Sequence, residues 1–493
     1  MDIQFNETTV QACQELARLT KTVQLTMESV VPDTKDDIGR ILSVRPEVYL
    51  KSKELRNRCA SIGGEAVVTV LYINETESAV SSFSFSQSFQ QEYELAAAED
   101  DDLLQIRLCS SGLQARALNP RKLSVDLEIS SELSVHRSCR CTISEQLPAD
   151  TGVPVHLQSI ETNVVLYTGV CEKSISLNDQ LQFPEGSQTP TEMIGKEVNY
   201  CLREKEIVGG RLLIKGDVNL TLYFFPEGSS IPASCQFQLP FSQLIDLGGE
   251  DAEEAELWFL PTSDYVNLIE SIDGRKLLDA EFHALVQVRS RRKQPIQYIS
   301  DAYSNQMPCE CQCSEQMLTE AVVDRQLRLT ADESIEMPEE YQELLSYYAE
   351  LGPCTVSQGS VVLDLLCRSK DEKLFAMRRN IALSPESDPM DVSGVSFTLK
   401  DFAVRQNGGS FNVRISVEGE GQEIKQTQIR RITALNLDEE RAYDLSAYPS
   451  LTAVWAETES IWELAKYYHS SPEAILALNE ELPHRPVFVP KTK

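Results

Sequence analysis

A segment of this chain recurs after about 152 residues without a gap, and this recurrence constrains the fold more than any other feature. The matched positions are apolar alternations, a proline and a glycine, which are the residue types that fix strands and turns. They include Lys21/Lys173, Val23/Ile175, Leu25/Leu177, Pro32/Pro184, Gly64/Gly216 and Val68/Leu220. No residue that performs chemistry recurs with them. A repeated scaffold without a repeated active site favours binding and assembly.

A third, looser copy follows, in which Arg325, Leu327 and Leu329 take the places of the first three matched residues. Gly359 then opens another alternating apolar run. The period is far longer than the roughly 20–50 residues of solenoid repeats, so these are whole domains in tandem. We expect domains at residues 20–140, 155–293 and 305–432.

Short alternating segments separated by turn residues dominate each copy, as in Glu65–Ile73 and Ser82–Phe89. This pattern predicts a mainly β protein of three tandem antiparallel β-sandwich or barrel-like domains, followed by the small C-terminal domain described below. Two exceptions are expected, one just before the first copy and one within it. Residues 10–19 have the spacing of a short helix, and Ile38–Leu42 is interpreted as a helical turn.

The composition limits the partners. The 493-residue chain carries a net charge of −31, which repels phosphate backbones and argues against nucleic-acid binding. The N-terminal segment has no secretory signal, no apolar run is long enough for a membrane span, and the thirteen cysteines are interpreted as reduced thiols. We therefore expect a soluble intracellular protein. Acidic clusters at Glu99–Asp102 and Glu250–Glu256 are expected to be solvated loops or, alternatively, docking sites for a basic partner.

The chain changes character after the third copy. Residues 433–450 are an acidic linker, and residues 451–493 show sustained helical periodicity. Ile461, Leu464, Ala465 and Tyr468 form one buried stripe, and Ser471-Pro472 starts a second helix whose Ile475, Leu476 and Leu478 are expected to face inward. With flanking short strands, the predicted order is β-α-α-β.

Trp462, Lys466 and Tyr467 lie off that buried stripe. Aromatic side chains beside a cation on an exposed helix face are typical of protein-binding hot spots. We expect these three residues, together with the preceding loop of Thr458, Glu459 and Ser460, to form a partner-binding face. The alternative is that Trp462 folds back against Trp455 to complete a small core.

The sequence contains few residue patterns typical of catalytic or metal-binding sites. Cys309, Cys311 and Cys313 form C-x-C-x-C, which on a strand brings thiols to one face, but the spacing of structural zinc sites is missing. Neither H-E-x-x-H, G-x-S-x-G nor a Walker A pattern occurs. We expect no enzyme, no cofactor and no metal; a hydrolase site assembled across the β domains is the alternative.

The C-terminal segment resembles a LysM domain through Glu459-Ser460-Ile461-Trp462, Leu464-Ala465, Tyr468, Leu476, Asn479 and Val489-Pro490. LysM domains generally bind N-acetylglucosamine polymers through two loops. Here both loops depart from the family pattern, at Thr458 and at Pro483–Pro486, so the resemblance does not carry glycan binding over.

The three copies resemble the SPOCS domain of clostridial spore-coat proteins, through Val31–Leu42, Gly63–Tyr72, Ile214–Phe224 and Gln297–Ser304. Three such domains followed by a LysM domain is similar to the layout of SipL-like spore-coat morphogenetic proteins. This resemblance implies a non-enzymatic adaptor in the mother-cell cytoplasm at the forespore surface. It also implies anchoring to a SpoIVA-like coat-basement ATPase through the LysM region, with other coat proteins as further partners. The alternative function is a peptidoglycan- or N-acetylglucosamine-polymer-binding protein.

Overall fold

The computed structural model describes residues 1–148, 152–229, 231–249, 251–272, 274–388, 391–455, 460–479 and 486–492. It is 75% strand and 4% helix, with antiparallel sheets throughout, which confirms the expectation of a mainly β fold. No helix among these described ranges is long and apolar enough to cross a membrane.

One six-stranded arrangement occurs three times. Repeat 1 consists of β2 (Asn6–Val30), β3 (Ile38–Arg56), β4 (Cys59–Asn74), β5 (Val80–Glu94), β6 (Leu103–Asn119) and β7 (Lys122–Gln146). It forms the three-stranded sheets β2-β7-β6 and β3-β4-β5.

Repeat 2 has the same order, with sheets β8-β13-β12 and β9-β10-β11. Its strands are β8 (Val155–Gln182), β9 (Pro190–Val208), β10 (Arg211–Pro226), β11 (Ala233–Asp246), β12 (Glu254–Glu270) and β13 (Lys276–Ser304). Repeat 3 pairs β14 with β19 and β19 with β18, and β15 with β16 and β16 with β17. Its strands are β14 (Cys309–Glu336), β15 (Tyr341–Leu351), β16 (Gly359–Ser369), β17 (Leu374–Pro385), β18 (Ser393–Asn407) and β19 (Ser410–Leu437).

The remaining elements belong to the two ends of the chain. β1 (Asp2–Gln4) pairs with β19, far from it in sequence. Two short 3-10 helices, η1 (Glu439–Arg441) and η2 (Leu445–Ala447), follow β19. Then come β20 (Leu451–Val454), α1 (Ile461–Tyr467), α2 (Pro472–Leu478) and β21 (Val487–Pro490), in the strand, helix, helix, strand order expected from the sequence.

Each repeat buries an apolar core between its two sheets, because alternate residues of every strand face inward. The recurring glycine explains part of this packing. Gly64 lies directly opposite Phe89 on the neighbouring strand, and Gly216 lies opposite Phe241. A Cβ atom on Gly64 would come within 2.3 Å of the Phe89 ring, and one on Gly216 within 2.7 Å of the Phe241 ring. The glycine therefore makes room for the ring that covers it.

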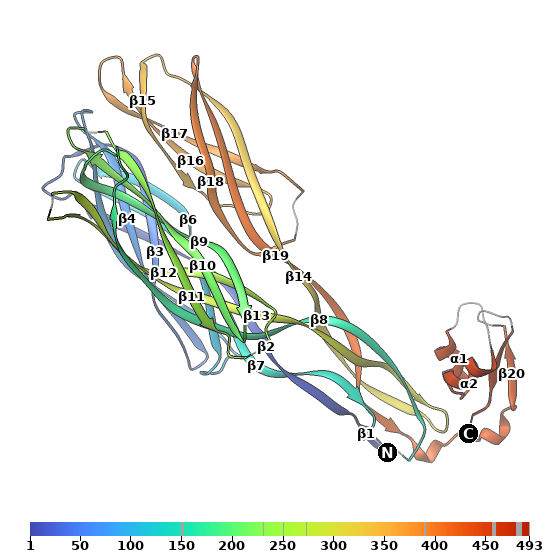
Figure 1. Cartoon of the computed structure of the whole chain (residues 1–493). Coiled ribbons are helices and arrows are strands. Elements are labelled where there is room, and N and C mark those ends of the chain that lie inside the picture. The colour runs from blue at the N-terminus through green and yellow to red at the C-terminus, as the bar shows by residue number, and fades with distance from the viewer. Residues whose placement is uncertain are drawn as a thin grey trace.

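The longest strands leave the sandwiches as three two-stranded ribbons that run together toward the C-terminal segment (Figure 1). Where each ribbon leaves its sandwich, one residue bulges out of register. These residues are Leu16 in β2, Thr168 in β8 and Glu320 in β14, at successive intervals of 152 residues. Bulges bend and twist a strand, and here they separate the sandwich from the ribbon extension. We call the bundled extensions the stalk; its core includes Val164, Ile296, Leu318 and Ile429.

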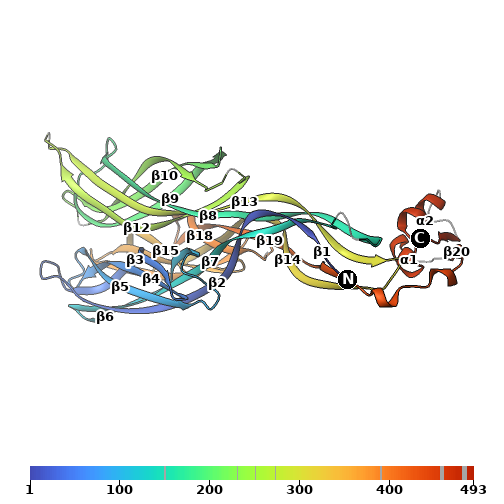
Figure 2. The same cartoon turned by 90° about the horizontal axis from the view of Figure 1, so that it is seen from below.

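The three repeats pack against one another and are not separate beads. One apolar cluster joins all three, with Leu42 from repeat 1, Ile194 and Phe225 from repeat 2, and Leu366 and Leu374 from repeat 3. A second cluster inserts two leucines of repeat 2 among residues of repeat 1. The result is an elongated molecule with the sandwiches at one end, the stalk in the middle and the small C-terminal module at the other end (Figure 2).

Two local predictions are wrong. Residues 10–19 are part of β2, not a helix, because they pair continuously with β7 apart from the bulge at Leu16, and Ala12 and Cys13 are buried in the stalk. Residues Ile38–Leu42 begin β3 and pair with the end of β4, so they form no helical turn. In both cases strand pairing overrides a weak local helical pattern.

Candidate partner-binding site

The C-terminal module comprises β20, α1, α2 and β21 and has its own small core. β20 and β21 pair antiparallel, and Leu464, Ala465 and Ile475 are buried beneath them. Ser460 caps α1 in a capping box with Glu463. Ser471 caps α2 with Pro472 at its start, which confirms the expected beginning of the second helix.

The Asn479 side chain connects α2 to β21 by hydrogen bonds. Its side-chain amide donates to the carbonyls of Ile475 and Phe488 and accepts from the Phe488 N–H at 2.9 Å. The inward orientation expected for Leu476 and Leu478 is wrong, since their exposed fractions are 51% and 48%. The module is too thin to bury more than one face of α2.

Helix α1 meets the stalk at one carboxylate, that of Asp301 near the end of β13. The Trp462 indole donates to Asp301 Oδ2 at 2.8 Å, and Lys466 Nζ lies 2.7 Å from both carboxylate oxygens. Burial by itself raises the pKa of Asp301, but the hydrogen bonds from Lys466 and Trp462 outweigh it and leave that pKa below its usual range. The carboxylate is therefore ionised at neutral pH.

Tyr303, two residues further along β13, completes this contact. Its ring packs edge-on against Trp462 with centroids 5.0 Å apart, and its hydroxyl donates to the Ser470 carbonyl at 2.8 Å. On its other side Tyr303 stacks on His156 of the paired strand β8. Asn305 adds a hydrogen bond to Thr492. We refer to the contacts of Asp301 and Tyr303 with the module as the Asp301–Tyr303 contact.

The structure divides the predicted binding residues into several groups. Trp462 is half-buried on Tyr303 instead of folding against Trp455, which is 72% exposed. Lys466 is engaged by Asp301, and the side chain of Ser460 is used in the helix cap. Tyr467 is 75% exposed on the same helix. Thr458 and Glu459 lie outside the described residues.

Sequence reasoning missed an exposed apolar surface on the outer face of the two-stranded sheet. Leu451 and Ala453 of β20 and Trp455, which follows the strand, are exposed at alternate positions, and Ala453 pairs with the exposed Phe488 of β21. Apolar residues at the alternate positions Leu451, Ala453 and Trp455 were the available signal in the sequence. An apolar sheet face on so small a module is typical of a surface that another protein covers.

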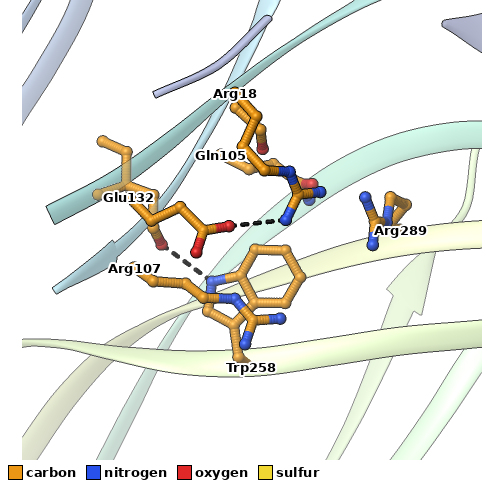
Figure 3. A pocket seen from close by; sticks show the side chains of 8 residues that line it. Arg18, Gln105, Arg107, Glu132, Trp258 and Arg289 are labelled. Atoms are coloured by element: carbon orange, nitrogen blue, oxygen red, sulfur yellow. Dashed lines mark hydrogen bonds and ion pairs between the residues drawn. The ribbon is translucent and has the colours of Figure 1, made fainter. Parts of the chain in front are cut away.

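A polar junction between repeats 1 and 2 was the other candidate for a site (Figure 3). Glu256 accepts from Arg107 at 2.8 Å and from Arg289 at 2.7 Å, while the Trp258 indole donates to the Ile106 carbonyl at 2.9 Å. The Arg107 guanidinium also lies over the Trp258 ring. These contacts connect the two repeats through opposite charges.

Arg18 and Glu132 complete the junction with an ion pair of 2.7 Å, as the dashed line in Figure 3 shows. The cavity between these side chains has a volume of about 10 Å³. Such a space holds about one water molecule, whereas small-molecule sites measure roughly 300–1,000 Å³. We interpret the junction as a structural connection between repeats.

The acidic clusters are only partly solvated loops. The Asp102 side chain is 2% exposed and pairs with Arg137 at 2.7 Å. Glu256, at the end of the second cluster, lies in β12 and pairs with Arg107 and Arg289. The expectation of fully solvated loops is wrong for these two residues, whose basic partners belong to the same chain.

All thirteen cysteines are free thiols. Cys309 and Cys311 share the inner face of β14 against the stalk core, and the Cys309 thiol hydrogen-bonds to the Cys311 sulfur and lowers the pKa of Cys311. Within the described ranges, no three His, Cys, Asp or Glu side chains are grouped so that they could hold a metal ion.

The fold thus defines a multi-repeat β-sandwich protein with a small helical module at the end of a stalk. Residues 37–108, from the start of β3 into β6, match the family model described as SipL, SPOCS domain. This match supports a SipL-like family and indicates a protein related to sporulation. No curated protein and no solved structure matched the chain significantly.

Proposed function

We propose that the protein is a non-enzymatic adaptor in spore-envelope assembly, with the C-terminal module as the anchor for a SpoIVA-like coat-basement ATPase. The family match over residues 37–108 carries this proposal. The place of action is the mother-cell cytoplasm at the forespore surface, where other coat proteins meet the three repeats.

The geometry of the module supports an anchoring role. It sits at the far end of the stalk, away from the sandwiches (Figure 1). Its side chains Trp455, Tyr467 and Phe488 are exposed. Exposed aromatic side chains of this kind dominate the energetics of protein interfaces. The three packed repeats then serve as a rigid spacer, because clusters shared between repeats restrict their relative motion.

The test is capture of the purified coat-basement ATPase by the immobilised full chain. Tyr467→Ala and Trp455→Ala are expected to weaken capture at least tenfold without changing the circular dichroism spectrum. Lys400→Glu, a charge change on β18 at the opposite end of the molecule, is the matched control and should bind normally. Normal capture by both aromatic variants would refute the assigned face.

Glycan binding is examined with the same immobilised protein. We expect no response to a soluble chito-oligosaccharide, because the sequence departs from the LysM pattern in both loops. A saturable response to the sugar together with none to the ATPase would replace the adaptor function with wall binding.

A further inference from the structure

Two hydrogen-bond donors of α1 converge on a single strand carboxylate. Trp462 Nε1 and Lys466 Nζ both bind Asp301, and the Tyr303 ring covers the indole from the next position on the same strand face. Hydrogen bonds from a cation to a carboxylate are stronger than those between neutral groups. This edge of α1 is therefore complementary to an acidic and an aromatic side chain two residues apart on a strand.

The fold of the stalk does not require that pair of residues. Each ribbon has a bulge near its far end, at Ile143 in β7, Ser300 in β13 and Thr433 in β19. Counted from these bulges, Asp301 and Tyr303 correspond to Ser144 and Gln146 in repeat 1, and to Ala434 and Asn436 in repeat 3. Neither counterpart pair supplies a carboxylate or a ring. The feature is specific to repeat 2, the ribbon that the module touches.

We propose that the C-terminal module binds a β-strand that carries an Asp-x-Tyr motif, through a site at Trp462 and Lys466 that we call the reading site. Asp301 and Tyr303 occupy this site in cis until a partner strand with the same two side chains replaces them. This inference rests on the proposed function, since it regulates the anchoring module. Docking thus begins with release of Trp462 and Lys466 from the stalk.

The contact is suited to exchange because it is small and tethered. It consists of one ion pair, one indole hydrogen bond, one aromatic pair and a tyrosine hydrogen bond, with the Asn305–Thr492 hydrogen bond beside them. A partly exposed ion pair contributes little by itself. A short tether raises the effective concentration of the two halves to the millimolar range, so a weak contact stays closed without a competitor. The 3-10 turns η1 and η2 form that tether.

The cis contact is tested first, in the isotopically labelled full chain. Its three tryptophans give three indole N–H signals, of which Trp462→Phe identifies one. Asp301→Ala/Tyr303→Ala should move the Trp462 signal toward that of the exposed Trp455, while the Trp258 signal in the polar junction stays in place. Asp301→Asn, which keeps the shape, should move it partway. An unchanged Trp462 signal in both variants would overturn the proposal.

Recognition in trans is tested with a synthetic peptide of the Gln297–Asn305 sequence. It should return the Trp462 signal of the Asp301→Ala/Tyr303→Ala chain toward its original position. In the unmodified chain, the response of the Trp462 signal to the peptide should be at least tenfold weaker. A peptide with Asn and Ala in place of Asp301 and Tyr303 is the control. Equal responses to the two peptides, or none to either, would refute the reading site.

Binding of the coat-basement ATPase separates this inference from the proposed function. Tighter capture by Asp301→Ala/Tyr303→Ala than by the unmodified chain is expected. Equal capture by the two chains would refute the regulation and leave the adaptor function standing. If neither chain captures the ATPase while the peptide still binds, the proposed function fails and the reading site stands.

Discussion

The glycine that recurs at Gly64 and Gly216 offers a quantitative test of the packing. Substituting Gly64 with alanine would place a Cβ atom 2.3 Å from Phe89 Cζ and 2.9 Å from the Tyr49 carbonyl oxygen. Carbon atoms pack best at about 3.5–4.0 Å, so the ring would have to retreat by more than about 1 Å. Overpacking of this kind costs about 1–3 kcal/mol, and the nearby backbone oxygen places Gly64→Ala toward the upper end.

Gly195→Ala is the matched control, because a Cβ atom there would meet only Thr69 Cγ2, at 3.7 Å. Reduced entropy of the unfolded chain should then stabilise that variant by up to about 1 kcal/mol. The two free energies of unfolding are measured by urea titration followed by circular dichroism. In a thermal scan, a change of 1 kcal/mol in the free energy of unfolding shifts the Tm by about 2–4 °C for a domain of about 150–250 residues.

A smaller ring partner should relieve the clash. In the double variant Gly64→Ala/Phe89→Leu, the loss is expected to be smaller than the sum of the two single losses, because the added methyl occupies space that the ring vacates. If Gly64→Ala unfolds at the same urea concentration as Gly195→Ala, the close approach of ring and glycine does not determine stability, and the reasoning fails.

Three further predictions concern a half-buried acid, the junction of the repeats and the module. Burial raises the pKa of Glu350 to about 7, although nearby arginines act to lower it. The folded state therefore loses stability as pH rises from about 4.5, the usual pKa of a glutamate, to 7. Glu350→Gln should be more stable than the unmodified chain at pH 8, by on the order of 3 kcal/mol, and the two should be nearly equal in stability at pH 5. Leu366→Ala, at a fully buried position where the repeats meet, should cost about 2–5 kcal/mol in the free energy of unfolding, and a loss below 1 kcal/mol would contradict a shared core. Asn479→Ala removes the hydrogen bonds to Ile475 and Phe488 and should make the module more sensitive to limited proteolysis while the repeats stay resistant.

Much of the sandwich architecture could be predicted because the alternating pattern of a strand is contained in the residues of that strand. The segment Glu65–Ile73 alternates inward and outward residues, and it lies in β4 with its apolar side chains in the core. The segment at residues 10–19 could not be assigned in this way. Its partners are the return strand β7 and the other ribbons of the stalk, so its burial depends on residues far away in the chain.

The Asp301–Tyr303 contact could not be predicted either, because its two sides are also far apart in the chain. Helical spacing was sufficient to place Trp462 and Lys466 off the buried stripe of α1. Their common partner Asp301 is 165 residues from Lys466, in a strand whose own pattern gives no sign of a helix nearby. An isolated aspartate in an alternating strand is indistinguishable from any solvated surface residue until the tertiary fold brings the module to it.

The pairing of β1 with β19 has a consequence for the time course of folding. Residues 2–4 leave the ribosome long before their partners, residues 434–436. At about 5–20 residues per second, the partner strand emerges on the order of 20–90 s later. Repeat 1 can complete its own sheets in that interval, whereas closure of the stalk around Ile3 and Leu435 must wait for the whole of repeat 3. Closure of the stalk is therefore a late folding step that joins strands from opposite ends of the three-repeat region, and such non-local pairing is slow.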